Sequence, residues 1–404
     1  MSKLGECLTI KHGWAFKGEF FAESGEQSIL TPGNFYEAGG FKYNDERERY
    51  YTGEYPHEYL CKKGDLIVAM TEQAAGLLGS TAIVPKDNRY LHNQRIGLIT
   101  CDEKHITKMF AYYLFMTKSV REQISRTSSG TKVKHTSPEK IYDVEVSLPD
   151  IPTQKKIAHF LWTIDCKIRN NIQINDNLQH QLKLLYDYWF TQFDFPDENG
   201  KPYRASGGAM VWNEQLRKEI PKDWSVTTVG DITVCHDSKR IPVSNVEREK
   251  MKGNIPYYGA TGIMGYVNRA IFSGDYVLLA EDGSVMDKNG NPIIQRVSGD
   301  VWINNHAHVL QPTGKYSCRL LMMILKDIPV TNIKTGSIQL KINQNNLNSY
   351  KILNIPNNII EKINQVFIPI DQQLIAIQKE VEYLFALRDW LLPMLMNGQA
   401  TISD

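Results

Sequence analysis

Two stretches of the chain carry mostly apolar residues at alternating spacings of three and four positions. In the first stretch the stripe runs through Leu161, Ile164, Ile168, Asn171, Asn175, Leu178, Leu182 and Leu185, and in the second through Phe367, Ile370, Leu374, Ile377, Val381 and Leu384. This spacing is typical of the seam of a coiled coil. Residues 154–192 could form one helix of about 58 Å, longer than a domain of about 150 residues can cover. The pattern therefore predicts two long helices that pair antiparallel as a rod between two globular domains, rather than two amphipathic helices that each pack on their own domain.

Polar residues and prolines interrupt both stripes. Asn171 and Asn175 lie at seam positions of the first helix, where a polar residue usually lowers stability and fixes the register. Pro369 lies inside the second stripe, and a proline within a helix costs about 3 kcal/mol or more. We therefore expect the second helix to start or kink at Pro369 and to end at Pro393.

The chain repeats itself outside the helices. Three segments of the first half recur in the same order in the second: residues 63–70 (KGDLIVAM) as 273–280 (SGDYVLLA), 90–95 (YLHNQR) as 302–306 (WINNH), and 129–132 (SGTK) as 335–338 (TGSI). The first pair is predicted to form a turn followed by a buried strand. The halves also end alike, with Leu148-Pro149 and Ile355-Pro356 before the helices and Ile164-Asp165 matching Ile370-Asp371 within them. A repeat of this order indicates a duplicated domain.

The repeat and the helices together define the expected architecture. The fold class is α+β, with two pseudo-symmetric mixed α/β domains separated by two long antiparallel coiled-coil helices. The expected boundaries are 1–150 for the first domain, 151–194 for the first long helix, 195–223 for a linker rich in turn formers, 224–355 for the second domain, and 356–404 for the second long helix and C-terminal tail.

Composition restricts the kind of protein. The chain has 404 residues, of which 42% are hydrophobic and 23% charged, as in globular proteins that do not bind to membranes. It carries neither an apolar run long enough for a membrane helix nor a secretory signal, so we expect it in the cytoplasm. The six cysteines are far apart in sequence, which favours free, buried thiols. Because 46 basic residues balance 45 acidic ones, any contact with nucleic acid must be local.

The usual signatures of catalysis are missing from the sequence. It contains no phosphate-binding P-loop, no G-x-S-x-G elbow and no H-E-x-x-H pair. His306 and His308 lie near Cys318 in sequence, but no carboxylate stands at ligand spacing, so we expect no metal site. Residues 254–257 (NIPY) differ by one proline from the N-P-P-Y motif of adenine methyltransferases, whose glycine-rich cofactor loop is missing here. A turn leading into a strand is the favoured interpretation of this segment.

Local basic segments point instead to binding. Residues 118–135 hold five lysines and arginines against one acid, Glu122, and the matching segment around Lys334 and Lys341 has no acid from residue 331 to 351. Both lie beside a turn of small residues, where backbone amides can approach phosphate while the lysines neutralise it. The candidates for contacting the DNA backbone are Arg126, Lys132, Lys134, His135, Lys334, Ser337 and Lys341.

Side chains that can distinguish bases flank these segments. Amides carry the donor and acceptor pair that recognises adenine, and arginine can recognise guanine. The candidates for base contacts are Asn93, Gln94, Arg95, Asn305, His306 and Gln339.

Taken together, these features resemble the specificity (S) subunits of type I restriction-modification enzymes over the whole chain. The resemblance rests on the repeat, on residues 255–263 (IPYYGATGI) and 279–283 (LAEDG), and on the helix ends, residues 183–190 (KLLYDYWF) and 387–398 (LRDWLLPMLMNG). It implies that each globular half is a target recognition domain for one part of a split double-stranded DNA site. The paired helices would hold the two domains apart and dock the methylating subunits.

The resemblance also implies which partners and cofactors to expect. The chain would have no activity and no cofactor of its own. It would direct two adenine methyltransferase (M) subunits, which use S-adenosylmethionine. In the full enzyme it would also direct two restriction (R) subunits, which are translocating nucleases driven by ATP with Mg²⁺.

Further DNA-binding candidates follow from the same resemblance. Two family segments near DNA match residues 257–262 and 282–284, and the first half departs from them around residues 31–34 and 72–76. The candidates from these segments are Tyr257, Tyr258, Thr261, Ser284, Asn34 and Gln73.

Two rival functions remain at the level of the sequence. The chain could itself be a DNA adenine methyltransferase acting through residues 254–257. Alternatively, it could be a coiled-coil adaptor with two protein-binding heads and no affinity for DNA, although the basic segments beside the glycine turns argue against this.

Overall fold

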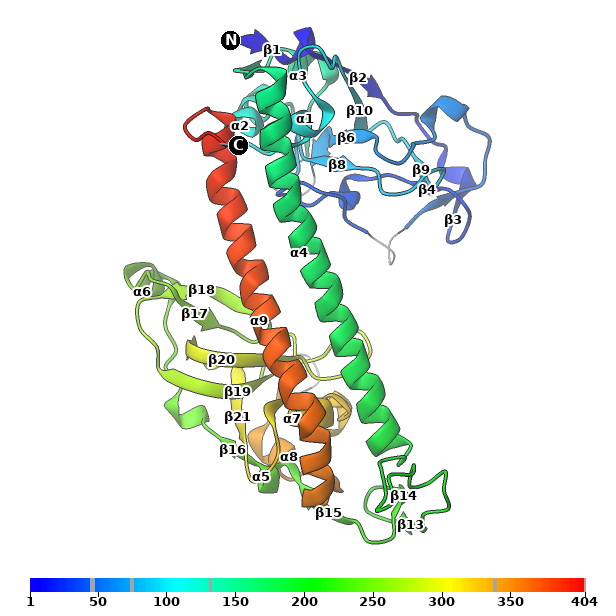
Figure 1. The fold of residues 1–404 in the computed structure, drawn as a ribbon, viewed down its shortest axis with the longest axis vertical. Helices are drawn as coiled ribbons and strands as arrows, with labels where there is room; N and C mark the ends of the chain where they lie inside the picture. The colour runs from blue at the N-terminus through cyan, green and yellow to red at the C-terminus, as the bar shows by residue number, and fades with distance from the viewer. Residues whose placement is uncertain (44–47, 73–75, 131–132, 337–339, 403–404) are drawn as a thin grey trace. The chain divides into compact units, whose positions relative to one another are not determined.

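The computed structural model describes residues 1–404 except 44–47, 73–75, 131–132, 337–339 and 403–404 (Figure 1). The chain divides into two compact units. Unit 1 comprises residues 1–170 and 381–404, and unit 2 comprises residues 171–380. Two long helices, α4 (Ile151–Tyr186) and α9 (Asn357–Met396), each contribute to both units.

Unit 1 is built on an antiparallel four-stranded sheet with the order β2-β10-β6-β8. Its strands are β1 (Ser2–Lys3), β2 (Leu8–His12), β3 (Phe21–Ala22), β4 (Ser28–Ile29), β5 (Tyr50–Tyr51), β6 (Leu66–Ala69), β7 (Thr71–Glu72), β8 (Thr81–Ile83), β9 (Tyr90–Leu91), β10 (Ile96–Cys101), β11 (Lys134–His135) and β12 (Glu145–Val146). Its short helices are α1 (Lys108–Leu114), α2 (Lys118–Thr127) and α3 (Pro138–Tyr142). One apolar core joins residues of the sheet and of α1 and α2 to both long helices.

Unit 2 is built on a six-stranded sheet with the order β16-β21-β19-β20-β17-β18. Its strands are β13 (Met210–Asn213), β14 (Lys218–Pro221), β15 (Ser225–Thr228), β16 (Thr233–Cys235), β17 (Ile255–Tyr258), β18 (Ile263–Val267), β19 (Phe272–Ala280), β20 (Ile294–Ile303), β21 (Ala307–Pro312), β22 (Lys334–Thr335), β23 (Lys341–Ile342) and β24 (Lys351–Asn354). Its short helices are α5 (Val229–Ile232), α6 (Asn245–Lys250), α7 (Cys318–Lys326) and α8 (Gln344–Asn348).

The strand order of the two sheets confirms the duplication. The antiparallel run β2-β10-β6-β8 of unit 1 corresponds to β16-β21-β19-β20 of unit 2. Each unit also contains a parallel strand pair: Ser28 of β4 lies opposite Tyr90 in a separate sheet of unit 1, and Tyr257 of β17 lies opposite Trp302 in the main sheet of unit 2. Tyr90 and Trp302 are the residues that the sequence repeat matches, so the repeat holds residue by residue at this point.

The two long helices pack against each other within each unit (Figure 1). In unit 1, Leu161 of α4 shares a core with Leu392 and Leu395 of α9. In unit 2, residues later in α4 share a core with residues earlier in α9, as Leu182 does with Phe367. Early residues of α4 thus pack on late residues of α9, and late residues of α4 pack on early residues of α9. This order confirms that the two helices are antiparallel.

The polar seam positions behave differently from each other. Asn171 is buried, and its Nδ2 donates to Oε2 of Glu380 on α9 at 2.8 Å, so it joins the two helices. Asn175 is half-buried, and its Oδ1 accepts a hydrogen bond from Gln179 on its own helix.

Both expectations for the ends of the second helix need correction. The helix does not begin at Pro369 or end at Pro393, because α9 runs from Asn357 to Met396 through both prolines. Each proline lacks one backbone N–H, and the burial of apolar side chains around it offsets that loss: Phe367 and Leu374 around Pro369, and Leu395 and Met396 after Pro393. The helix stops at Gly398, whose φ of 69° is the left-handed conformation typical of a helix end.

The segment 195–223, which we expected to be a linker, is a folded part of unit 2. β13 and β14 form a hairpin with Met210 opposite Pro221. Phe195 is buried and stacks between Tyr203 and Trp224 at ring-centroid distances of 4.8 Å. Turn formers dominate the composition, but the aromatic residues between them supply the apolar area that fixes the segment.

The six cysteines are free, as we expected. Three of them, Cys7, Cys61 and Cys318, are buried, and the other three are half-buried.

A buried ion pair joins the two long helices in unit 1. Nη1 of Arg388 lies 3.1 Å from Oδ1 of Asp165, the hydroxyl of Tyr113 donates to Oδ2 of the same carboxylate at 2.6 Å, and all three side chains are buried. Replacing Arg388 with Met should lower the free energy of unfolding by about 3–5 kcal/mol, because it leaves the Asp165 charge buried without its partner. Urea unfolding measures this change.

Two further variants test the assignment. Asp165→Asn in the Arg388→Met background should recover part of the loss, since the buried charge is then gone. Arg169→Met, on the exposed side of the same helix, should cost less than about 1 kcal/mol. An equal loss for Arg169→Met and Arg388→Met would contradict a special role for the pair.

Candidate nucleic-acid interface

The turn between β20 and β21 presents two exposed polar residues, Asn305 and His306, in unit 2. The buried Asn304 shapes this turn, since its Oδ1 accepts a hydrogen bond from the backbone N–H of His306 at 2.9 Å. Nδ1 of His306 lies 2.7 Å from Oδ1 of Asp282, and the carbonyl of His306 accepts from the N–H of Glu281 at 2.9 Å. Two segments that the sequence analysis singled out, around residues 282 and 305, therefore lie side by side.

A network of charged side chains lies beneath this turn. Nη1 of Arg240 lies 2.6 Å from Oε2 of Glu281 and donates to the carbonyl of Ala307 at 2.7 Å. Nζ of Lys341 lies 3.0 Å from Oε1 of the same glutamate. Burial raises the pKa of Glu281, but the hydrogen bonds from Arg240 and Lys341 outweigh burial and hold that pKa below its usual value. The network is therefore ionised at neutral pH.

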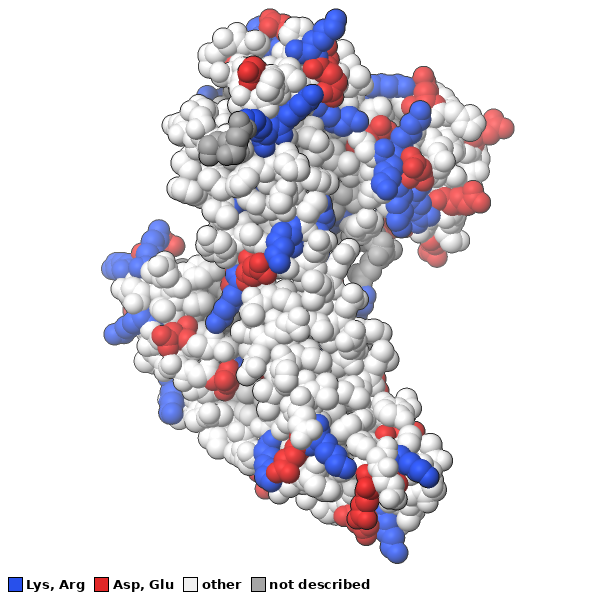
Figure 2. Space-filling model, viewed as in Figure 1, with Lys and Arg blue, Asp and Glu red and all other residues white. Residues whose placement is uncertain are grey.

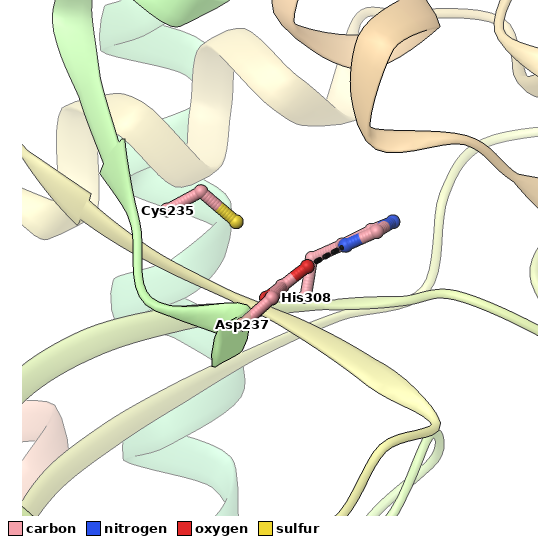
Figure 3. A group of neighbouring side chains, drawn as sticks. All are labelled: Cys235, Asp237 and His308. Carbon is pink, nitrogen blue, oxygen red and sulfur yellow. Dashed lines mark hydrogen bonds and ion pairs between the residues drawn. The ribbon is translucent and has the colours of Figure 1, made fainter. Parts of the chain in front are cut away.

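His308 extends the network into the sheet. Figure 3 shows it facing Asp237, with Nδ1 2.5 Å from Oδ2, while Nε2 lies 3.0 Å from the carbonyl of Ile342. Burial lowers the pKa of His308, but the hydrogen bond and charge of Asp237 outweigh it and raise the pKa above its usual value. Both ring nitrogens face acceptors, as they do in a protonated imidazole.

Cys235, Asp237 and His308 also form a group of potential metal ligands (Figure 3). Its donor atoms are already engaged, however. Asp237 accepts from the N–H of Val309 and pairs with both His308 and Arg240, whose Nη2 lies 3.3 Å away. A cation there would have to displace His308 and face the guanidinium of Arg240, so the group fits an ion-pair network better than a metal centre. The cysteine of the group is Cys235, whereas the sequence drew attention to Cys318.

The equivalent turn of unit 1 lies between β9 and β10 and exposes Gln94 and Arg95. Oδ1 of the half-buried Asn93 accepts from the N–H of Arg95 at 3.1 Å. The backbone of Trp14 holds the turn from below, donating to the carbonyl of His92 at 2.8 Å and accepting from the N–H of Gln94 at 3.2 Å.

Residues 13 and 14 are functional candidates that the sequence analysis missed. A Cβ on Gly13 would lie 2.1 Å from the carbonyl oxygen of Asn93, so only glycine allows this approach of the two backbones. Trp14 is 41% exposed beside the turn, and its ring lies 5.4 Å from that of Tyr59. An exposed aromatic ring beside polar amides could contact DNA, but no sequence pattern distinguishes Trp14 from a core tryptophan.

The predicted basic residues lie close to acids or polar groups. Lys134 has its Nζ 3.9 Å from Oε1 of Glu72, and Arg126 pairs with Glu122 at 3.5 Å. The exposed His135 has Nδ1 3.0 Å from the hydroxyl of Thr71. In unit 2, Lys334 is half-buried in the β22–β23 pair, opposite Ile342. On the face drawn in Figure 2, both signs of charge are interspersed on each unit.

Two predicted contact residues are buried and need correction. Asn34 is 4% exposed, its Oδ1 accepting from the N–H of Thr31 and its Nδ2 donating to the carbonyl of Lys42. Tyr257 is 2% exposed and stacks on Trp302. Both residues therefore support the fold and cannot touch DNA in this conformation. The sequence did not show this because residue type alone does not establish whether a side chain is buried.

The remaining candidates are more accessible. Thr261 and Ser284 are exposed, and Tyr258 is half-buried. The amide of Gln295 holds the turn before Thr261 by donating to the carbonyls of Gly259 and Ala260. Gln73, Lys132, Ser337 and Gln339 lie outside the described residues.

The rival methyltransferase motif lacks the expected setting. Asn254 is exposed, and the residues after it form β17, which pairs with β18 on one side and β20 on the other. Tyr257 is the buried member of this strand, as the interpretation as a turn and strand predicted.

The structure thus defines a protein of two homologous units that present different polar turns from equivalent places on a sheet. The sequence profile of the type I restriction modification DNA specificity domain matches residues 1–180 and 221–383. The chain belongs to this family. It is therefore a DNA-recognition subunit without catalytic activity, which sets aside both the methyltransferase and the adaptor hypotheses.

Individual relatives agree with the family. The chain is similar to the type I restriction enzyme MjaIX specificity subunit of Methanocaldococcus jannaschii, with 28% identity over 74% of this chain and 70% of that protein. It is 20% identical to the HindI specificity subunit of Haemophilus influenzae over 84% of this chain and 87% of that protein. The fold is similar to that of the type I restriction-modification S subunit from M. genitalium, with a TM-score of 0.61, 17% identity, and coverage of 99% and 96% of the two chains.

None of the helices in the described part of the chain is long and apolar enough to cross a membrane.

Unit 1 should lose stability on acidification because of one buried histidine beside its turn. Burial lowers the pKa of His92 to about 4, against about 6.5 in an unfolded chain. Between these values the unfolded chain binds a proton that the folded unit does not. The free energy of unfolding should therefore fall by up to about 3 kcal/mol as the pH drops from about 6.5 to about 4.

The variant His92→Asn tests this assignment, because asparagine does not titrate and is the residue at the matching position of unit 2, Asn304. Hydrogen exchange of the β6 and β10 amides at a series of pH values gives the stability of unit 1. If the variant lost as much stability as the wild type over this window, His92 would not be the group responsible.

Proposed function

We propose that the chain recognises a bipartite double-stranded DNA site, with each unit contacting one part of the site. The observation that carries this proposal is the pair of equivalent turns with different exposed residues: Gln94 and Arg95 in unit 1, and Asn305 and His306 in unit 2. Amides pair with adenine and arginine with guanine in the major groove, so the two turns would prefer different bases.

The phosphate backbone would be contacted by the neighbouring basic segments. Arg126, Lys134 and His135 in unit 1 and Lys341 in unit 2 are candidates for this role, together with Lys132 outside the described residues. Their pairing with acids limits their non-specific affinity, because a phosphate must compete with Glu122, Glu72 or Glu281 for the same cation. This agrees with a chain whose net charge is near zero.

We further propose that two adenine methyltransferase subunits dock on the long helices. On α9, Trp390 is 63% exposed with Tyr383 seven residues before it on the same face. In the π-helical turn Asp187–Thr191 that follows α4, Tyr188 is 37% exposed, with the exposed Leu184 of α4 one turn before it. In the register that matches Asp165 with Asp371, Leu184 corresponds to Trp390, and both side chains are exposed. Such matched apolar surfaces suit two copies of one partner.

The proposed partners supply all of the chemistry. The methyltransferase subunits would transfer a methyl group to adenine from S-adenosylmethionine, and two restriction subunits would add translocation and cleavage driven by ATP with Mg²⁺. The complex would work in the cytoplasm, where bacterial and archaeal DNA is located.

Replacing a base-reading residue should change specificity, and replacing a phosphate contact should not. Gln94→Ala and Asn305→Ala should each cost about 1–3 kcal/mol at particular base pairs, each in a different part of the site. Lys134→Ala should weaken binding to all duplexes alike and reduce the salt dependence by about one released ion. Binding titrations with single base-pair variants of the methylated site, at several salt concentrations and with the methyltransferase partner present, measure both effects. The same uniform loss for all three variants would refute the assignment of roles.

Removing either exposed aromatic residue of the long helices should remove one partner subunit. Trp390→Ser and Tyr188→Ser should each weaken one docking site by about 2 kcal/mol or more, so that one methyltransferase subunit binds tightly in place of two. Native mass spectrometry counts the subunits directly. Trp212→Ser, at an exposed tryptophan on β13 outside the long helices, is the matched control and should retain both subunits. Loss of both subunits in every variant would argue against separate helix sites.

A further inference from the structure

The guanidinium of Arg240 contacts four residues around the β20–β21 turn. Nη1 donates to the carbonyls of Asn305 at 3.3 Å and Ala307 at 2.7 Å and pairs with Glu281 at 2.6 Å. On its other side, Nε donates to the backbone carbonyl of Asp237 at 3.1 Å, and Nη2 lies 3.3 Å from the carboxylate of the same residue. The side chain is 12% exposed. Arg240 thus binds the backbone of the turn on both sides of His306.

The acids that hold Arg240 are themselves tied to the turn and the sheet. Glu281 donates its backbone N–H to the carbonyl of His306 while its carboxylate binds Arg240 and Lys341. Asp237 binds the backbone N–H of Val309 and the ring of His308. Any movement of the turn would therefore break several charge-assisted hydrogen bonds at once, which makes the backbone of Asn305 and His306 rigid.

Strand register identifies the corresponding positions in unit 1. In unit 1, Lys11 lies opposite Leu98, and Leu98 lies opposite Ile67. In unit 2, Cys235 lies opposite Leu310, and Leu310 lies opposite Val277. Since the sequence repeat matches Ile67 with Val277, Lys11 corresponds to Cys235. The same registers give the unit 1 counterparts of the charged residues. Asp237 corresponds to Gly13, Glu281 to Thr71, and His308 to Ile96.

The two units therefore hold equivalent turns by different physical means. Unit 1 has uncharged residues at all three places and fixes its turn through the close backbone contact of Gly13 and the backbone bonds of Trp14. Unit 2 uses buried charges. Since uncharged residues at these places form the corresponding sheet in unit 1, the sheet itself does not require these charges, which are costly to bury. Their common feature is that they converge on the turn.

We propose that Arg240 is a positioning residue that fixes the Asn304–Ala307 turn for base discrimination, so that only the part of the DNA site contacted by unit 2 depends on the buried network. This rests on the proposed function, because it assumes that Asn305 and His306 contact bases. Arg240 itself contacts no DNA in this scheme. It acts through the backbone conformation of the turn, and a lysine, which lacks the planar fork, can replace only part of its bonds.

The test compares Arg240→Met and Arg240→Lys with the control Lys239→Met in the full chain bound to its methyltransferase partner. Lys239 is an exposed neighbour, so the control removes the same charge without touching the network. The readout is the ratio of affinities for the methylated site and for duplexes with one base pair changed in either part. In Arg240→Met the ratio for the part contacted by unit 2 should fall about tenfold or more, with the other part unchanged within about twofold. The ratio for Arg240→Lys should lie between those of Arg240→Met and the wild type, and the ratio for Lys239→Met should equal that of the wild type.

Hydrogen exchange separates positioning from general unfolding. In Arg240→Met, amides of residues 304–307 should exchange faster while those of β19 stay protected. The proposal is overturned if Arg240→Met keeps the unit 2 ratio, if both ratios fall together, or if protection is lost throughout β19 in both Arg240 variants. A different result identifies failure of the proposed function itself: the wild-type chain would not discriminate in that part of the site, or Asn305→Ala would have no effect on it.

Discussion

The structure depends on the seam between α4 and α9, because both helices complete the core of both units. Each helix buries an aspartate at the matching repeat position, and each charge needs a cation. In unit 1 the cation of Asp165 is Arg388, from the partner helix. In unit 2, Asp371 pairs with Arg319 of α7 at 2.6 Å and Arg296 of β20 at 3.1 Å. One aspartate thus fixes helix to helix, and the other fixes helix to sheet.

The duplication separates what must be conserved physically from what can vary. Strand order, the parallel pair at Tyr90 and Trp302, and the buried aspartates are common to both units. The turns between the matching strands differ, and so do the contacts that support them. Unit 1 uses a glycine and backbone hydrogen bonds, and unit 2 uses five charged side chains. Both arrangements hold a turn at the ends of matching strands, so the same sheet topology accommodates either.

Much of the fold could be predicted from the sequence because its signals are local and repeated. The stripe of spacings predicted both helices and their pairing, and the repeat predicted which strands correspond. The prolines misled us because their cost was judged without the burial of the apolar side chains around them, which offsets it. Residues 195–223 misled us for the opposite reason, since turn formers masked the stacking of Phe195 on Trp224.

The candidate site was less predictable because residue type does not report burial. Asn34 and Tyr257 satisfy their polar groups inside the protein, whereas Asn305 and Gln94 do not, and nothing in their sequence neighbourhoods separates the two cases. Arg240 and Trp14 were missed because their importance comes from residues distant in sequence, such as Glu281 and Asn93. Contacts of this kind arise only when strands meet.

The limits of the units have a consequence for the order of folding during synthesis. Unit 2 is a continuous segment, residues 171–380, whereas unit 1 needs residues 381–404 to close the core around Leu161. The domain translated first is therefore completed last, because it waits with an open apolar face until Leu392 and Leu395 leave the ribosome. A chain interrupted after Glu380 and before Leu392 would therefore contain every residue of its second unit and lack part of the core of its first.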